Sequence, residues 1–313
     1  MSSVHERVSS IAAGSAGSSV WLAGTSAPMR EVERALGHLA HANVNLVIHG
    51  EPGTGKSVLA ERIHCLGPRA EDPFVPIAIE KLPEAEVEQL LFGAEGVLAP
   101  TAPRTTVYID AIHALTPRLQ VRMVEALAQR DFEHDVRVIA GTSAPLEELT
   151  RLGRFRRDLF FRLAVVRIAL PPLRERREDI AVVAEQVVVE WCEAAGAPRL
   201  GLSRMAIAEL MSYAWPGNAR ELEQTIEAVL ALSRGTEVTA ERIRAVLGRR
   251  PRRYAAPDVF PLRQLERDYI AGVLTSCNWN QSLAARRLGI GRNTLMRKIK
   301  SFGLRAASAE VAA

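Results

Sequence analysis

Residues 50–57 match a phosphate-binding loop, which is a glycine, four residues, a second glycine, a lysine and a serine or threonine. The predicted nucleotide-binding residues of this loop are Gly50, Glu51, Pro52, Gly53, Thr54, Gly55, Lys56 and Ser57. Glycines let backbone N–H groups turn toward an anion, and a helix that begins at the loop adds partial positive charge. We expect Lys56 on the β- and γ-phosphates and the Ser57 hydroxyl on Mg²⁺. The pattern predicts a site for ATP and Mg²⁺; a glycine-rich turn that binds nothing is the alternative.

The segments on either side of the loop have the character that the motif needs. Residues 44–49 form a short, mostly apolar run typical of a buried parallel strand. Residues 57–64 place apolar side chains at helical spacing. The sequence therefore predicts a strand, the loop and a helix in that order.

Strands and helices are predicted to alternate through the first half of the chain. Further strands are expected at residues 74–79, 105–110, 136–141 and 165–170, and helices at 29–40, 84–91 and 117–129. This alternation predicts an α/β fold built on a parallel sheet with flanking helices. The strand at 105–110 ends in an acid, Asp110.

After Pro172 the pattern changes to helices without strands between them. They are expected at residues 180–194, 203–213, 218–233 and 239–247, which predicts a separate all-helical subdomain. We therefore divide the chain into a flexible tail (1–19), an α/β nucleotide-binding subdomain (20–175), a helical subdomain (176–248), a linker (249–261), a basic helical unit (262–306) and a tail (307–313).

The basic helical unit has the pattern of a helix-turn-helix. Small residues Ala284 and Ala285 allow two helices to cross closely, and Gly289 supplies a tight turn before a second helix at 292–300. The second helix would enter the DNA major groove. Its N-terminal residues 292–294 would face bases, and its later basic residues would contact phosphates. The predicted DNA-binding residues are Arg292, Asn293, Thr294, Arg297, Lys298 and Lys300. The alternative is a three-helix cap whose basic residues only solvate it.

The amphipathic segment 265–277 precedes these two helices. We expect it to form a helix that pairs two such units across a palindromic DNA site.

Composition excludes several protein classes. The chain has 313 residues, of which 48% are hydrophobic and 24% charged, and a formal net charge of +4. Such a composition is typical of an ordinary globular protein, and no run approaches the roughly 18 apolar residues of a membrane helix. Cys65, Cys192 and Cys277 are few and scattered, which predicts reduced thiols instead of disulfides or a zinc site. We expect a cytoplasmic protein without a membrane partner.

Four motifs resemble those of one known family. Besides the loop, they are residues 153–163 (Gly-Arg-Phe-Arg-Arg-Asp-Leu-Phe-Phe-Arg-Leu), 170–180 (Leu-Pro-Pro-Leu-Arg-Glu-Arg-Arg-Glu-Asp-Ile) and 215–222 (Trp-Pro-Gly-Asn-Ala-Arg-Glu-Leu). Residues 21–247 resemble the AAA+ domain of bacterial sigma-54-dependent activators, also called enhancer-binding proteins. The C-terminal unit resembles the Fis-type helix-turn-helix of the same proteins.

The resemblance implies roles for three arginines and one segment. Arg156 and Arg162 would be arginine fingers that reach the nucleotide of a neighbouring subunit, because a guanidinium is always charged and forks onto phosphate oxygens. Arg220 would be the arginine of the helical lid that senses the γ-phosphate. Residues 22–24 would line the adenine pocket. A solvated or ion-paired surface group is the alternative for each arginine.

The chain departs from the family beside the nucleotide. The residue after Asp110 should be a glutamate that polarises the attacking water, and here it is Ala111. Asp110 keeps the means to hold Mg²⁺, but a methyl group cannot accept a proton, so hydrolysis should be slow. Ala78 stands where the family has an asparagine that switches the glutamate, and Thr142–Ser143 stands for a sensor Thr–Asn pair. Glu80 and Glu95 are near in sequence, but we do not expect either to replace the glutamate.

A second departure is a deletion. Residues 94–104 are too few for the family's inserted loop, with its Gly-Ala-Phe-Thr-Gly-Ala motif, that grips the sigma factor. We therefore expect a DNA-binding regulator that binds ATP for assembly or signalling, acting as a dimer or hexamer. An intact AAA+ relative or RNA polymerase is a further candidate partner. The alternatives are an active ATPase that activates sigma-54 RNA polymerase, and a nucleotide sensor with vestigial DNA binding.

Overall fold

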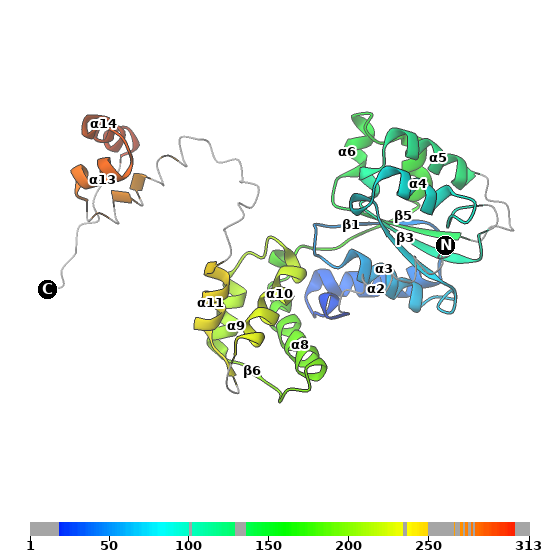
Figure 1. Ribbon diagram of the computed structural model, residues 1–313, viewed down its shortest axis with the longest axis horizontal. Coiled ribbons are helices and arrows are strands. Elements are labelled where there is room, and N and C mark those ends of the chain that lie inside the picture. The colour runs from blue at the N-terminus through cyan, green and yellow to red at the C-terminus, as the bar shows by residue number, and fades with distance from the viewer. Residues whose placement is uncertain are drawn as a thin grey trace. The chain divides into compact units, whose positions relative to one another are not determined.

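The chain folds into two compact units, residues 1–251 and 252–313, and each is described by itself (Figure 1). In this computed structural model the described residues are 19–99, 102–128, 136–233, 237–249, 266, 270, 271, 273, 274, 277 and 279–303. Apart from Ser19 and Arg249, the predicted tails and linker lie outside the described residues, as does most of the predicted helix 265–277. Among the described helices, none is long and apolar enough to cross a membrane.

Five parallel strands form one sheet in the order β2-β3-β4-β1-β5. They are β1 (Leu46–His49), β2 (Phe74–Ala78), β3 (Thr105–Asp110), β4 (Val136–Thr142) and β5 (Val166–Ala169). The predicted α/β fold on a parallel sheet is confirmed. His49 pairs in register with Thr142, and Ala78 pairs with Asp110. The strand ends therefore bring the phosphate-binding loop, Asp110 and Thr142 to one edge of the sheet, where ligands of parallel sheets bind.

Helices cover both faces of the sheet (Figure 1). They are α2 (Ala27–His41) and α3 (Lys56–Cys65) on one face, and α4 (Glu84–Phe92), α5 (Pro117–Ala128), α6 (Leu146–Arg151) and α7 (Arg157–Leu163) on the other. Successive strand residues point to opposite faces, so Leu46 and Ile48 pack on the α2–α3 side and Val47 on the other. The sequence did not predict α6 or α7, which are too short to show a helical period.

The helical subdomain contains α8 (Asp179–Ala194), α9 (Arg204–Ser212), α10 (Asn218–Ala231) and α11 (Ala240–Arg249). They pack around Trp215, which is fully buried and donates its indole N–H to the Leu210 carbonyl. The predicted helical subdomain is confirmed, with one addition that the sequence did not predict. Two short parallel strands, β6 (Gly201–Leu202) and β7 (Glu237–Val238), pair beside the helices. Segments of two residues carry no alternating pattern that a sequence analysis could detect.

The C-terminal unit contains α13 (Gln281–Arg287) and α14 (Arg292–Phe302). Asn280 caps α13 by accepting a hydrogen bond from the Leu283 N–H, and Gly289 has a φ of 67° in the turn between the helices. Ala284, Ala285 and Leu295 are buried between the helices. The predicted turn and the two helices are therefore present.

Candidate functional site

The phosphate-binding loop joins β1 to α3 and is ordered by its own lysine. The Lys56 ammonium donates to the Gly50 carbonyl at 2.9 Å and to the Glu51 carbonyl at 3.1 Å. Only 9% of Lys56 is exposed, and this burial lowers the pKa of its ammonium. Gly55 precedes α3 with a φ of 102° and has no side chain to cap the helix. The first N–H groups of α3 therefore face the loop without a side-chain acceptor, which suits an anionic ligand.

Asp110 lies at the end of β3, next to the loop. Its Oδ1 accepts a hydrogen bond from the Tyr108 hydroxyl at 3.0 Å. Burial, the Asp110 charge and this hydrogen bond raise the pKa of Tyr108, so the phenol remains a donor. The two side chains lie on one face of the strand because residues two apart share a face. The sequence predicted Asp110 as a site residue. The one signal that Tyr108 would accompany it was the spacing of two residues along the strand.

Ala111 adopts a left-handed backbone conformation, with a φ of 57°, and only 8% of its surface is exposed. A residue with a β-carbon pays a steric penalty there, so the surrounding fold holds the turn. Its methyl group offers no proton acceptor beside Asp110. The structure therefore holds a left-handed turn directly after Asp110 with only a methyl group at its centre.

A histidine and a glutamate that the sequence analysis did not favour lie at the same edge. The ring of His113, in the 3-10 helix η3 (Ile112–Ala114), has its Nε2 atom 3.6 Å from Oε1 of Glu80. Glu80 belongs to η2 (Ile79–Lys81), directly after β2. The other candidate acid, Glu95, is exposed in a turn after α4. No spacing in the sequence indicated that Glu80 and His113 would meet.

The residues predicted to hold Mg²⁺ are Ser57 and Asp110. Among the described residues, no group of three His, Cys, Asp or Glu side chains could enclose a metal ion. Magnesium in phosphate-transfer sites is usually held by one or two carboxylates together with phosphates and water. One carboxylate and one hydroxyl beside a phosphate-binding loop fit that donor set.

The helical subdomain contacts the loop through Glu51. The Arg174 guanidinium donates to both Glu51 carboxylate oxygens, at 2.6 and 2.7 Å. The Asn218 side-chain amide donates to Glu51 Oε2 at 3.1 Å and to the Pro52 carbonyl at 3.0 Å, and its oxygen accepts from the Leu173 N–H. Asn218 therefore holds Glu51 and Pro52 to the start of α10. The Glu51 carboxylate is occupied by its contacts with Arg174 and Asn218.

Arg220, the predicted γ-phosphate sensor, also lies beside the loop. Its backbone N–H donates to the Gly53 carbonyl at 3.3 Å, and its guanidinium lies 5.3 Å from the centre of the Trp21 ring. The positive charge of Arg220 contributes to the lowered pKa of Lys56. A β-carbon on Gly55 would meet Leu22 and Trp21 at 3.4 Å. The segment predicted to contact adenine thus borders the loop.

The two predicted arginine fingers lie on the surface. The Arg156 guanidinium is 46% exposed and makes a two-point ion pair with Asp158, at 3.0 and 2.7 Å. Arg162 is exposed near the end of α7, and its carbonyl accepts a hydrogen bond from the Asn45 side chain. Both side chains are placed at the surface, as a group that reaches another subunit must be.

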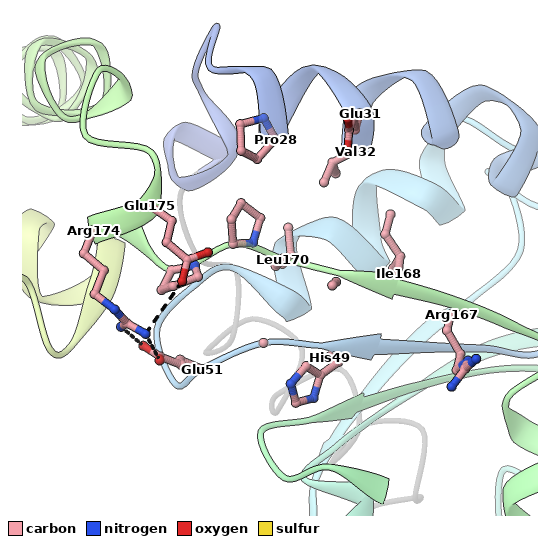
Figure 2. Close-up of a pocket in the computed structure, with 14 residues that line it drawn as sticks. Pro28, Glu31, Val32, His49, Glu51, Arg167, Ile168, Leu170, Arg174 and Glu175 are labelled. Carbon is pink, nitrogen blue, oxygen red and sulfur yellow. Dashed lines mark hydrogen bonds and ion pairs between the residues drawn. The ribbon is translucent and has the colours of Figure 1, made fainter. Parts of the chain in front are cut away.

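A cleft of about 540 Å³ lies beside the loop, between α2 and the ends of β1 and β5 (Figure 2). Figure 2 shows the Arg174–Glu51 pair at one end and His49 near the ends of the strands. The cleft borders Gly50 and Glu51, whereas Lys56 is not in its lining. It is therefore lined by the start of the loop and not by the lysine.

In the C-terminal unit, α14 presents most of the predicted DNA-binding residues on its exposed side. Arg292, Asn293, Arg297 and Lys300 are exposed, and Thr294 is partly exposed. Lys298 differs, because its ammonium forms an ion pair with Glu266 and is only partly exposed. The arrangement offers four polar or basic side chains to a DNA duplex.

Comparison with known proteins places these features in one family. Residues 22–169 match the Sigma-54 interaction domain, residues 174–258 the AAA+ ATPase lid domain, and residues 261–302 the Fis family of bacterial regulatory proteins. The chain is 32% identical to the transcriptional regulatory protein ZraR of Salmonella typhimurium, over 88% of this chain and 67% of ZraR.

The chain belongs to the sigma-54-dependent activator family.

Other members of the family support this assignment. NtrC of Escherichia coli, a DNA-binding transcriptional regulator, is 32% identical over 90% of this chain and 70% of NtrC. Crystal structures of NtrX from Brucella abortus with ADP and with ATP match at TM-scores of 0.67 and 0.66, both with 30% identity. They cover 96% and 90% of this chain, and 73% and 69% of NtrX. As a sigma-54-dependent activator family member, the chain combines an ATP-binding AAA+ module with a DNA-binding unit.

Proposed function

We propose that this chain is a sequence-specific DNA-binding regulator that uses ATP for assembly or signalling more than for hydrolysis. The observation that carries the proposal is the contrast at the end of β3. Lys56, Ser57, Asp110 and Arg220 remain where they would hold a triphosphate and Mg²⁺, whereas Ala111 takes the place of the carboxylate that would activate water. The loss of a positioned general base typically lowers a rate by roughly 10²–10⁴-fold.

The short segment after α4 argues against direct remodelling of sigma-54 polymerase. The N–H groups of Val97 and Leu98 donate to the carbonyls of Leu90 and Leu91, both at 2.9 Å, so the segment folds back on α4. The family's gripping loop has no counterpart in this stretch of sequence. These contacts support a role that does not require gripping the sigma factor.

Self-association through bound nucleotide is supported by the surface around α7. Leu152, Phe161 and Val165 expose between 56% and 61% of their surfaces near Arg156 and Arg162. Exposed apolar residues close together are typical of protein contacts. An ATP molecule shared between subunits would hold several DNA-binding units together and increase avidity for DNA with several sites.

The test measures ATP binding and phosphate release separately. We expect the purified chain to bind Mg-ATP in calorimetry and to release phosphate slowly. Ala111→Glu should raise phosphate release by about 100-fold, because it restores the base, while Ala111→Gln has nearly the same shape and should not. Rapid phosphate release by the unmodified chain would instead favour the alternative function, an ATPase that activates sigma-54 RNA polymerase.

The assembly role is tested with the lysine of the loop. Lys56→Ala should abolish Mg-ATP binding, and with it the ATP-dependent increase in particle size and in DNA occupancy. Arg204→Ala, at an exposed basic residue on α9 (Arg204–Ser212), is the control. Unchanged particle size and DNA occupancy in Lys56→Ala would contradict the assembly role.

A further inference from the structure

Polar side chains from three successive strand ends meet at the edge of the sheet that carries the phosphate-binding loop. Glu80 follows β2, His113 follows β3 and Thr142 ends β4. The His113 ring lies between the other two, with Nδ1 3.2 Å from Thr142 Oγ1 and Nε2 3.6 Å from Glu80 Oε1. The three residues form a chain of polar contacts. The hydrogen bonds of Lys56 and Asp110 described above are made to other groups.

The hydrogen bonds of Thr142 determine which nitrogen of the neutral ring carries the hydrogen. The Thr142 hydroxyl donates its single hydrogen to the Ala144 carbonyl at 2.9 Å. Toward His113 it can therefore only accept, so Nδ1 must be the donor. The lone pair of the neutral ring is then on Nε2, the atom that faces Glu80. Thr142 thus favours the neutral tautomer whose proton-accepting nitrogen is Nε2.

Charged groups from three neighbouring elements act on His113. Glu80 and Asp110 favour the protonated ring, and Lys56 opposes it. Burial has the largest effect and lowers the pKa of His113 below its ordinary value of 6.5. A ring that is neutral near pH 7 has its lone pair available, and the Glu80 carboxylate stabilises a proton after it arrives. The Glu80 charge also acts to raise the pKa of Lys56, so Glu80 lies close enough to the phosphate-binding loop to affect its lysine.

We propose that His113 is the proton acceptor for a slow hydrolysis of ATP, and that Thr142 and Glu80 position its ring. The inference rests on the proposed binding of ATP at the loop. His113 Nε2 takes a proton from the water whose oxygen bonds to the γ-phosphorus. The bond from that phosphorus to the bridging oxygen breaks, and its electron pair leaves with ADP. The imidazolium then returns its proton to solvent beside Glu80, whose side chain is 62% exposed.

The competing groups at this edge are less suited to the role. Ala111 has no polar atom in its side chain, and the Asp110 carboxylate accepts from Tyr108 and is the predicted Mg²⁺ ligand. Glu80 itself is largely solvated, so water competes for its carboxylate. His113 has a ring that is held through Nδ1 by Thr142, and its other nitrogen, Nε2, lies on the side of Glu80.

The test compares phosphate release across pH 5 to 9 in the full chain and in His113→Gln. We expect release by the wild type to rise with pH through one ionisation below about 6.5 and then to level off. His113→Gln should lose at least about tenfold of this release while its affinity for Mg-ATP in calorimetry changes little. Glu80→Gln should move the ionisation to lower pH, because it removes a charge that favours the imidazolium. His38→Gln, an exposed histidine on α2, is the control.

A readout without turnover comes from nitrogen NMR of the labelled histidines. It should show His113 as the neutral Nδ1–H form at pH 7, and Thr142→Val should lose this preference. Release that does not change in His113→Gln, or that never exceeds the Lys56→Ala background, would overturn the proposal. Calorimetric binding of Mg-ATP would still report on the proposed function independently.

Discussion

Asp179 is a fully buried carboxylate whose partners lie more than 150 residues earlier in the chain. It accepts hydrogen bonds from the Thr25 N–H at 2.7 Å, the Ser26 N–H at 2.8 Å and the Ser26 hydroxyl at 2.6 Å. A β-carbon on Gly24 would lie 2.2 Å from its carboxylate carbon, so the contact also requires a glycine there. The first residue of α8 thus fixes the segment that borders the phosphate-binding loop.

Replacement of Asp179 tests this contact. Asp179→Ala leaves three buried donors without an acceptor and should lower the free energy of unfolding by about 3–5 kcal/mol. Asp179→Asn keeps an acceptor oxygen and should lose less. Urea unfolding measures both, with the exposed neighbour Glu178→Ala as the control. A loss under about 1 kcal/mol in Asp179→Ala would show that water satisfies these donors.

At this scale the sequence predicted residues that belong to a local motif and missed those that meet through the fold. Lys56 and Asp110 were predicted because spacing along the chain marks them. Glu80 and His113 come together only because β2 and β3 are neighbours in the sheet. Strand order is a property of the folded chain, so no window of sequence contains it.

At the scale of elements, the helical subdomain is joined to the phosphate-binding loop by the Glu51–Arg174 pair and by Asn218. The hydrogen bond from Arg174 is the largest cause of the lowered pKa of Glu51, and Asn218 adds to it. The folded state therefore favours the Glu51 carboxylate over the acid. The stabilisation is fully present above the ordinary pKa of 4.5 and is lost as pH falls through the lowered value.

The pH dependence of this contact can be measured by unfolding. Arg174→Ala should lower the free energy of unfolding at pH 7 by less than about 1 kcal/mol, because both partners are over a third exposed. The difference from wild type should shrink below pH 4.5 as Glu51 becomes protonated in both proteins. Arg177→Ala removes an exposed positive charge nearby and controls for net charge. A difference that stays constant down to pH 3 would assign the effect to packing.

The strands of the sheet were predicted because each is a short apolar run between polar turns. The structure places β1, β2, β3 and β5 within those runs, and β4 extends one residue beyond its run, to Thr142. The turn between α13 and α14 follows its glycine signal. The small strands β6 and β7 were missed because they form through contact with each other across 34 residues. Short elements of that kind depend on tertiary pairing more than on local preference.

At the scale of the whole molecule, DNA binding should show separate contributions from base and phosphate contacts. Lys300→Ala should weaken binding to all sequences and reduce the salt slope by about 0.9, since one phosphate contact is lost. Arg292→Ala should instead cost about 1–3 kcal/mol at the specific site and little elsewhere. Fluorescence anisotropy at several salt concentrations measures both, and Arg151→Ala in the other unit is the control. Equal losses on specific and random DNA in Arg292→Ala would place Arg292 on a phosphate.

The predicted arginine fingers belong to the same scale, because their partner is another molecule. Arg156→Ala should leave Mg-ATP affinity of the isolated chain unchanged and reduce ATP-dependent self-association by at least about tenfold. Sedimentation at several protein concentrations measures this, with Arg204→Ala on α9 unaffected. A loss of ATP affinity in dilute Arg156→Ala would mean that the arginine acts within its own chain.

The left-handed turn at Ala111 has a consequence for the history and use of this protein. The backbone after Asp110 holds its bend with a methyl side chain, so the bend itself does not depend on a carboxylate there. On the proposed function, this one position would set how fast bound ATP is consumed, so that Ala111→Glu and its reversal would switch the same fold between slow and rapid turnover.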